Sequence, residues 1–430
     1  MNKLLLEWRR LRSSDLARNA GWMFFGQGFS VVCQGVYFLF LARLLGSVQY
    51  GIFVGAVATV SILSQYSTLG MYSVFLRYVC PNPSNFARYW GNVIMANVFL
   101  GTTFVFLLGW GGPRIAHSFS AAMVVCLAIS DCLFAQFTQA AGRVFQAFEM
   151  MKVTAALSLL TNLLRMVLAG TMLMVLHRTT ASHWVVATLI ISCVAALLAA
   201  VLVTRRFGLP VFSLRLLRDR LGEGFVFALS YSTGAIYNDI DKVMLGHFGL
   251  NAANGVYTMA YRIVDIGTMP FNSIQAAAFP RFFRLGVDGL NNTAGYAIRI
   301  IRHTVPIAVL CAAVMFLAAP IIPHLVEPGF AQSVEALRWL CLIPIFRALH
   351  ISAGDALTAS GDQRIRLGTQ ATVSVFNFCV NLYLIPHFGW RGAAWASLAT
   401  DGLLVVLNWG AVLGLRSRTT VLSNSVVSSD

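Results

Sequence analysis

The segment LLGSVQYGIF, residues 44–53, recurs with one inserted residue as HFGLNAANGVY, residues 247–257. After the insertion the two copies keep a constant offset of 204 residues. The matched positions are Gly51 and Gly255, Phe53 and Tyr257, Phe75 and Phe279, Arg77 and Arg281, and Tyr78 and Phe282. The repeat predicts a chain built from two related halves.

The composition around this repeat is that of an integral membrane protein. Hydrophobic residues make up 58% of the 430 positions and charged residues only 11%, whereas a soluble domain is about 25% charged. A helix needs roughly 20 mostly apolar residues to cross the bilayer. Runs of that length predict twelve spans, at 20–44, 50–74, 89–111, 117–141, 152–176, 182–204, 222–248, 253–279, 304–326, 332–357, 365–386 and 391–415.

The basic residues alternate between the two sides of these spans. With the N-terminus in the cytoplasm, 22 of the 31 lysines and arginines fall at cytoplasmic ends, and four lie on the opposite side. This asymmetry predicts a multi-pass protein with both termini cytoplasmic. It also argues against a nucleic-acid-binding surface, whose basic charge would not alternate from loop to loop.

Since 204 residues contain six spans, both halves have the same membrane orientation, as in transporters built from parallel repeats. We therefore expect an all-α polytopic fold with two pseudo-symmetric six-helix lobes around a central cavity. The expected parts are an amphipathic N-terminal segment (1–18), an N-lobe (19–204), a basic cytoplasmic linker (205–221), a C-lobe (222–415) and a cytoplasmic tail (416–430). The eight cysteines are scattered without a CxxC pair, so we expect no disulfide framework, metal site or other cofactor.

Several spans carry polar stripes when their residues are projected at 100° each. In span 253–279 the stripe contains Tyr257, Tyr261, Asp265, Thr268, Asn272 and Gln275. Span 20–44 places Gln27, Ser30, Gln34 and Tyr37 on one side, span 50–74 has Ser61, Ser64, Gln65, Thr68 and Tyr72, and span 222–248 has Tyr231, Gly234, Asn238 and Lys242. Stripes on matched helices favour a shared aqueous cavity, while single polar residues can instead form hydrogen bonds between helices.

Charged residues are concentrated in three of the spans. Asp239, Asp241 and Lys242 occur within four positions of span 222–248. A charge inside the bilayer persists when it faces water, a partner or a ligand. Asp241 and Arg262 lie at similar expected depths, so a structural ion pair between the two spans is an alternative to a ligand site. In span 332–357, Arg347 and His350 align on one face, with Asp355 at its edge.

The chain resembles the Wzx-like polysaccharide flippases of the multidrug/oligosaccharidyl-lipid/polysaccharide exporter superfamily. The resemblance covers residues 16–415 and is carried by four segments, ARLLGSVQYGIF (42–53), STLGMYSVFLRYV (67–79), NDIDKVMLGHFGLNAANGVYTMAYRIVDIGTMPFNSIQAAAFPRFFRL (238–285) and WRGAAWASLATD (390–401). It implies a protein of the bacterial inner membrane that flips an undecaprenyl-diphosphate-linked oligosaccharide to the outer face by alternating access. It leaves the polymer open among O-antigen, capsule and exopolysaccharide.

For that ligand the basic residues are the first candidates, because guanidinium and ammonium groups bind phosphate oxygens. Lys242, Arg262 and Arg347 are the strongest, with Arg165 weaker. The further substrate-binding candidates are Tyr257, Tyr261, Gln34, Gln65 and Asn238. The candidates for coupling to a proton or Na⁺, or for ion pairing, are Asp239, Asp241, Asp265, Asp355 and His350.

Two alternatives to a lipid-linked-oligosaccharide flippase remain. A multidrug antiporter of the same superfamily should have a more acidic or aromatic pocket for cationic drugs. A membrane glycosyltransferase, ligase or polymerase needs catalytic acidic or histidine residues outside the bilayer, and the outer loops carry only scattered histidines. Expected partners are the lipid-linked oligosaccharide and membrane lipids, with a polysaccharide polymerase as a further candidate.

Overall fold

The computed structural model describes the backbone of residues 2–115, 119–287 and 289–427. Side chains are described within these ranges apart from residues 2–27, 113, 115, 230, 277, 280 and 417–427. The amphipathic surface expected of residues 1–18, the side chain of Gln27 and the side chains of the tail beyond residue 416 therefore lie outside the described residues. Every regular element in the described ranges is helical, which confirms the all-α prediction.

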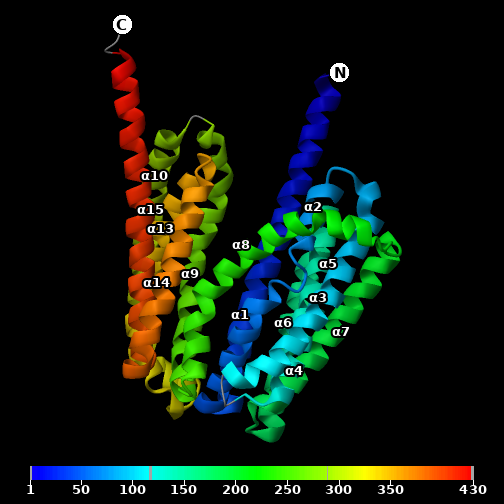
Figure 1. Ribbon diagram of the computed structural model, residues 1–430, viewed down its shortest axis with the longest axis vertical. Coiled ribbons are helices and arrows are strands. Elements are labelled where there is room, and N and C mark those ends of the chain that lie inside the picture. Colours follow the sequence, from blue (N-terminus) through cyan, green and yellow to red (C-terminus); the bar gives the residue numbers. More distant parts are fainter. Residues whose placement is uncertain (1, 116–118, 288, 428–430) are drawn as a thin grey trace. The chain divides into compact units, whose positions relative to one another are not determined.

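The chain divides into two compact units, unit 1 (Met1–Asn251) and unit 2 (Ala252–Asp430). Unit 1 contains α1 (Asn2–Ser64), α2 (Met71–Val79), the 3₁₀ turn η1 (Pro83–Asn85), α3 (Phe86–Ile115), α4 (Ala121–Ala128), the π-helix η2 (Ile129–Ala135), α5 (Gln136–Ala147), α6 (Met151–Leu176), α7 (Ala181–Phe207) and α8 (Leu214–His247). Figure 1 shows α3, α5, α6 and α7 running alongside one another. Helix α1 packs against α6 and α8, and α7 packs against η2.

Unit 1 has an aromatic core at the ends of α2, α3, α5 and α7. Phe86 on α3 packs against Phe75, Trp90, Phe148 and Phe207, with ring centroids 5.3–6.5 Å apart. Such rings contribute large apolar areas and favourable edge or stacked contacts. This core holds together the helices that surround the cavity described below.

Two matched glycines both have a positive φ. Gly46 interrupts α1 with φ 69°, and Gly249 lies between α8 and α9 with φ 71°. Both values fall in the left-handed region, which glycine enters without the penalty that a Cβ imposes. The conformation agrees with the alignment of these two positions in the quoted repeat.

The repeat is not followed everywhere. Helix α1 ends at Ser64, and the backbone turns through Leu69 (φ 45°) and Gly70 (φ 64°) before α2 begins. A Cβ on Gly70 would lie 2.5 Å from the carbonyl oxygen of Gly224 on α8, so glycine permits this close approach. In the other half, α9 continues without a break through the equivalent positions.

Unit 2 is formed by the second half of the chain. Its elements are α9 (Asn251–Gly286), α10 (Leu290–Ala318), η3 (Ala319–Ile321), α11 (Ile322–Leu325), η4 (Pro328–Phe330), α12 (Ser333–Leu340), α13 (Ile343–Ala359), α14 (Gln363–Phe388) and α15 (Trp390–Val427). Helix α13 packs against α10 and α15, and α15 also packs along α14. Phe282 of α9 packs with Ala297 and Ile300 of α10.

Among the described residues, eight helices are long and apolar enough to cross a membrane, or nine if Pro328–Leu340 and Ile343–Ala359, bent by 41°, form one span. The predicted count of twelve is therefore not confirmed. Most of the first two predicted spans lies in the stretch Gly28–Ser64, in which the non-helical backbone of Gly46 (φ 69°, ψ 169°) separates two helices. Helices α8 and α9 are long but rich in polar residues, and neither is among the eight.

The predicted linker 205–221 is largely helical. Helix α7 extends to Phe207, and α8 begins at Leu214, where the hydroxyl of Ser213 accepts a hydrogen bond from the Leu216 amide. This side-chain cap satisfies one of the unpaired amides at the helix start. Helix α8 therefore combines part of the linker with the seventh predicted span in one element.

Candidate functional site

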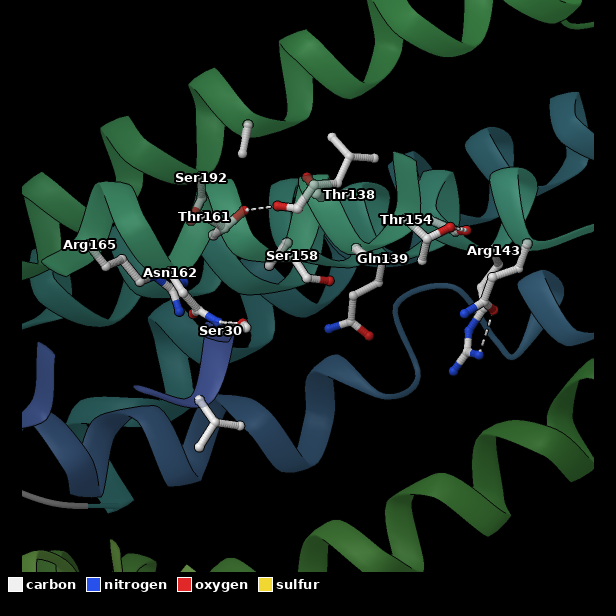
Figure 2. A pocket seen from close by; sticks show the side chains of 17 residues that line it. Ser30, Thr138, Gln139, Arg143, Thr154, Ser158, Thr161, Asn162, Arg165 and Ser192 are labelled. Atoms are coloured by element: carbon white, nitrogen blue, oxygen red, sulfur yellow. Dashed lines mark hydrogen bonds between the residues drawn. The ribbon is translucent and has the colours of Figure 1, made fainter. Parts of the chain in front are cut away.

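Unit 1 contains a cavity of about 580 Å³ that extends among α1, η2, α5, α6 and α7 (Figure 2). Its lining residues are Ser30, Val31, Ala135, Thr138, Gln139, Gly142, Arg143, Gln146, Thr154, Ala155, Leu157, Ser158, Thr161, Asn162, Arg165, Ser192 and Ala195. None of these seventeen residues is acidic or aromatic. The cavity wall is therefore made of hydroxyl, amide and small apolar groups together with two guanidinium groups.

Two polar stripes form most of this wall. On α6 the polar residues are Thr154, Ser158, Thr161, Asn162 and Arg165, and on α5 they are Thr138, Gln139, Arg143 and Gln146. Spacings of three, four, seven and eight residues place such side chains on one helix face. The hydroxyl of Thr154 donates a hydrogen bond to the Gly142 carbonyl at 3.1 Å, which joins the two helices beside the α5–α6 turn.

Several of the lining side chains are occupied by hydrogen bonds inside the protein. The Thr138 hydroxyl donates to the Phe134 carbonyl of the preceding η2, and the Thr161 hydroxyl donates to the Leu157 carbonyl of its own helix. The Asn162 amide donates to the Ser30 hydroxyl at 2.6 Å and thereby connects α6 to α1. Arg143 is exposed and donates to the Gln146 side chain at 2.9 Å.

Three other lining side chains have no hydrogen-bond partner in the described part of the chain. They are Gln139, Ser158 and the buried Nε of Arg165. Figure 2 shows Gln139 and Ser158 between the two arginines, with Arg165 and Arg143 at opposite ends of the view. Asp131 of η2 interacts electrostatically with Arg165, although no ion pair between them lies within 4.0 Å. The cavity thus presents unused donors and acceptors.

A polar contact between α1 and α8 brings together residues of two predicted polar stripes, those of spans 50–74 and 222–248. The Lys242 ammonium donates to Asp239 at 2.6 Å and to the Asn238 carbonyl at 2.7 Å. The hydroxyl of Ser61 on α1 donates to the other oxygen of Asp239 at 3.2 Å. Asp241 is buried and accepts a hydrogen bond from the Lys242 amide at 2.7 Å. The acidic and basic residues of α8 thus form a connected network.

The start of α8 is fixed by a second network that the sequence did not reveal. Glu223 accepts a hydrogen bond from Arg77 at 2.7 Å and from the Tyr78 hydroxyl at 3.2 Å. Arg220 donates to the same Tyr78 hydroxyl at 2.7 Å, and its guanidinium lies over the ring. Arg77, which the repeat matches with Arg281, therefore connects α2 to α8.

In unit 2 the predicted basic residues form a cluster around one carboxylate. Asp265 lies 3.7 Å from Arg262 on the same helix and 3.6 Å from Arg347 on α13. The Arg347 guanidinium also donates to the Tyr261 hydroxyl at 3.2 Å. The structure thus joins three of the predicted substrate-binding residues and one predicted coupling residue in one place.

The other predicted polar residues of α13 have partners on α14 and α15. Asp355 pairs with Arg366 at 3.3 Å. His350 lies 3.3 Å from the buried carboxylate of Asp401. The sequence analysis did not identify either Arg366 or Asp401 as partners, because spacing along one helix does not show which residue of another helix faces it.

The expected hydrated face of α9 is corrected by the structure for part of its length. Tyr257 is fully buried and its hydroxyl lies 2.8 Å from that of Ser397. Gln275 is also buried and donates to Ser352 at 3.0 Å. Both side chains are occupied by helix packing, as in the alternative of hydrogen bonds between helices. Asn272 of the same stripe is exposed.

Among the predicted substrate-binding residues, only Arg165 lines the cavity of unit 1. Gln34 and Asn238 are exposed, and the Gln65 amide donates to the Ser61 carbonyl at 3.4 Å. The sequence analysis projected the repeat-matched spans and missed the polar stripes of α5 and α6. Projection of Thr154 through Arg165 at 100° per residue would have found the α6 stripe. The shared chamber of Lys242, Arg262 and Arg347, like the pairing of Asp241 with Arg262, stays a prediction.

Comparisons with known proteins agree with the helical architecture and identify the family. A family profile described as Polysaccharide biosynthesis protein matches residues 16–286. The uncharacterized membrane protein MJ1068 of Methanocaldococcus jannaschii is 26% identical over 190 residues, 43% of this chain and 37% of that protein. The probable flippase AglR of Haloferax volcanii is 27% identical over 192 residues, 42% of this chain and 38% of that protein. The matches therefore span less than half the length of these curated relatives.

Solved structures share the fold over nearly the whole chain. An inward-facing multidrug resistance MATE family transporter of the MOP superfamily has a TM-score of 0.73 at 15% identity, covering 91% of this chain and 96% of the transporter. The lipid II flippase MurJ in an inward closed conformation has a TM-score of 0.73 at 12% identity, covering 91% of this chain and 87% of MurJ. At these identities the likeness establishes the transporter fold.

Proposed function

This chain belongs to the polysaccharide biosynthesis protein family, and from that premise we propose that it flips a lipid-linked oligosaccharide across a membrane for surface polysaccharide synthesis. The carrier is undecaprenyl diphosphate, and the direction is from the cytoplasmic to the outer face of the bacterial inner membrane. The protein acts as a transporter by alternating access, with both termini in the cytoplasm. The physical task is to shield a hydrophilic head group from hydrocarbon while the lipid tail stays in the bilayer.

The observation that carries the proposal is the chemistry of the unit 1 cavity. Its wall offers hydroxyl and amide side chains, which hydrogen-bond to sugar hydroxyls, and two arginines, which bind oxyanions with directional donors. The cavity begins beside the α5–α6 turn, a predicted cytoplasmic loop. A head group built in the cytoplasm would therefore enter at the end where Arg143 is exposed.

The same wall distinguishes this proposal from a multidrug antiporter. A pocket for cationic, aromatic drugs needs carboxylates or aromatic faces to stabilise the positive charge. The seventeen lining residues contain neither, and the two formal charges among them are positive. This polarity favours a neutral or anionic hydrophilic ligand.

The ion pairs outside the cavity fit a transport cycle in which contacts are exchanged. Lys242 is held by Asp239, and Arg262 and Arg347 share Asp265. A diphosphate that approached these basic groups would compete with the carboxylates for them. Protonation of Asp239 or Asp265 would weaken these ion pairs. Asp355 and His350, which contact Arg366 and Asp401 instead, and Asp241 remain candidates for coupling to a proton or Na⁺.

Reconstitution of the purified full chain tests the function. Proteoliposomes would carry a fluorescent undecaprenyl-diphosphate oligosaccharide on one leaflet, and a membrane-impermeant quencher would report its arrival on the other. We expect translocation above the rate in protein-free vesicles. Ethidium transport under a proton or Na⁺ gradient, with no movement of the glycolipid, would contradict the proposal and favour the multidrug antiporter.

A further inference from the structure

The position of Arg165 within its helix suggests that this residue contacts a ligand. Arg165 is the fifteenth residue of the 26-residue helix α6, about 21 Å along its axis from the first residue. A guanidinium at that depth of a ~30 Å hydrocarbon layer persists when it faces water, a partner or a ligand. Its Nε is buried without a hydrogen-bond partner, whereas the neighbouring Asn162 amide is engaged by Ser30.

The remaining groups with unused hydrogen-bonding capacity lie between Arg165 and the cavity mouth. Thr154 marks the mouth end of α6, and Arg165 lies eleven residues further on, about 16 Å along the helix. Ser158 and Gln139 are positioned between these ends and have no partner among the described residues (Figure 2). An elongated polyol can bind their amide and hydroxyl groups along this length.

We propose that the unit 1 cavity is the binding site for the hydrophilic head group, in which Arg165 binds an oxyanion and Gln139 and Ser158 bind hydroxyl groups of the attached saccharide. This inference rests on the proposed function and assigns its substrate contacts. The oxyanion comes either from an acidic sugar or from the lipid diphosphate. The first supplies a planar carboxylate and the second a tetrahedral phosphate. The oxygens of either group can accept hydrogen bonds from a guanidinium.

Asp131 is an acidic group near Arg165, and its negative charge competes with an anionic ligand for the guanidinium. It is carried by the π-helix η2, and its charge acts on Arg165 through space. π-helical segments are common at functional sites because they shift side chains out of the α-helical register. Since no ion pair within 4.0 Å joins Asp131 to Arg165, the arginine keeps donors for an incoming anion. Asp131 balances its charge when the cavity is without ligand.

Protection of an introduced cysteine tests occupancy of the cavity. Ser158→Cys places a thiol in the cavity, and Thr171→Cys places one on an exposed, non-lining position of the same helix. Maleimide labelling of the purified full chain is measured with background subtraction for the eight native cysteines. The probes are geranyl diphosphate, a uronic-acid disaccharide and a neutral disaccharide of the same linkage.

We expect one anionic probe, at about ten times its Kd, to slow labelling of Ser158→Cys about tenfold without slowing Thr171→Cys. Adding Arg165→Gln should raise the protecting concentration at least about tenfold, because it removes charge-assisted hydrogen bonds. Protection by the disaccharide acid identifies a sugar acid as the oxyanion, and protection by geranyl diphosphate identifies the lipid diphosphate.

Three results would overturn the inference: no protection by either anion, equal protection by the neutral disaccharide, or protection unaffected by Arg165→Gln. Failure of the proposed function is a separate result. It would appear as absence of glycolipid translocation by the wild-type chain. If the wild type translocates the glycolipid but no anion protects Ser158→Cys, the function stands and the cavity assignment fails.

Discussion

Two groups of polar residues, one buried in unit 2 and one lining the cavity of unit 1, are used differently. In unit 2, Asp355 is paired with Arg366, and Gln275 is bonded to Ser352. In unit 1, the cavity presents Arg165, Gln139 and Ser158 without hydrogen-bond partners among the described residues. Polar residues of the same types therefore stabilise helix packing in the first group and remain available in the second, although unit 1 also contains packing contacts such as that between Asn162 and Ser30. The contacts of a polar residue, and not its hydropathy, show whether it is a candidate for helix packing or for ligand binding.

The largest effect should come from removing one member of a buried ion pair in unit 2. The Arg366 guanidinium contacts Asp355 at 3.3 Å and the Thr358 hydroxyl at 2.6 Å. We expect Arg366→Leu to lower the free energy of unfolding by about 3 kcal/mol, because it leaves the Asp355 carboxylate buried without this cation. Chemical unfolding of the purified chain in nanodiscs measures the change.

The matching control removes both charges. In Asp355→Leu/Arg366→Leu no carboxylate remains to be compensated, so most of the lost stability should return. A double variant that is as unstable as Arg366→Leu would show that the pair does not account for the loss.

A smaller difference in the free energy of unfolding is expected between variants of two glutamines, one in each unit. Gln275 donates to Ser352 at 3.0 Å and to the Ala348 carbonyl at 3.3 Å, whereas Gln139 faces the cavity. Gln275→Leu should lower the free energy of unfolding by about 1 kcal/mol, the usual net value of such bonds. Gln139→Leu should change it by less than about 0.5 kcal/mol. Equal losses in both variants would remove the distinction between the units.

The smallest effect is expected for the arginine of the cavity. Arg165→Leu removes a guanidinium whose Nε has no partner, so the free energy of unfolding should change by less than about 0.5 kcal/mol. The same substitution at Arg366 should be far more costly. If unfolding measurements instead show a loss near 3 kcal/mol at Arg165, its role is structural, and an ion pair with Asp131 is the first explanation to test.

Much of the fold could be predicted from the sequence, because runs of apolar residues indicate membrane helices and the internal alignment indicates the repeated halves. The matched glycines at 46 and 249 share a left-handed conformation, as their alignment suggests. The break between Ser64 and Met71 could not be predicted from the repeat. It depends on the contact of Gly70 with Gly224 of α8, and the backbone of α9 has no such turn at the equivalent positions.

The candidate site was predicted only in part. Arg165 was predicted as a weaker substrate-binding candidate and Asp239 as a candidate for coupling or ion pairing, and Asp239 pairs with Lys242 in the structure. The partners Arg366 and Asp401 lie on other helices, so periodicity along one helix could not identify them. The α5–α6 wall was not predicted because the predicted span 117–141 ends before Arg143, whereas α5 continues to Ala147.

The rate of glycolipid translocation by wild type, Arg165→Gln, Arg165→Lys and Arg205→Gln is the most direct test of the central claim. Arg205 is exposed at the end of α7 and provides a charge-matched control outside the cavity. We predict that Arg165→Gln lowers the initial rate at least about tenfold, that Arg165→Lys is intermediate, and that Arg205→Gln matches wild type. A well-folded Arg165→Gln protein that translocates the glycolipid at the wild-type rate would contradict the assignment of the unit 1 cavity.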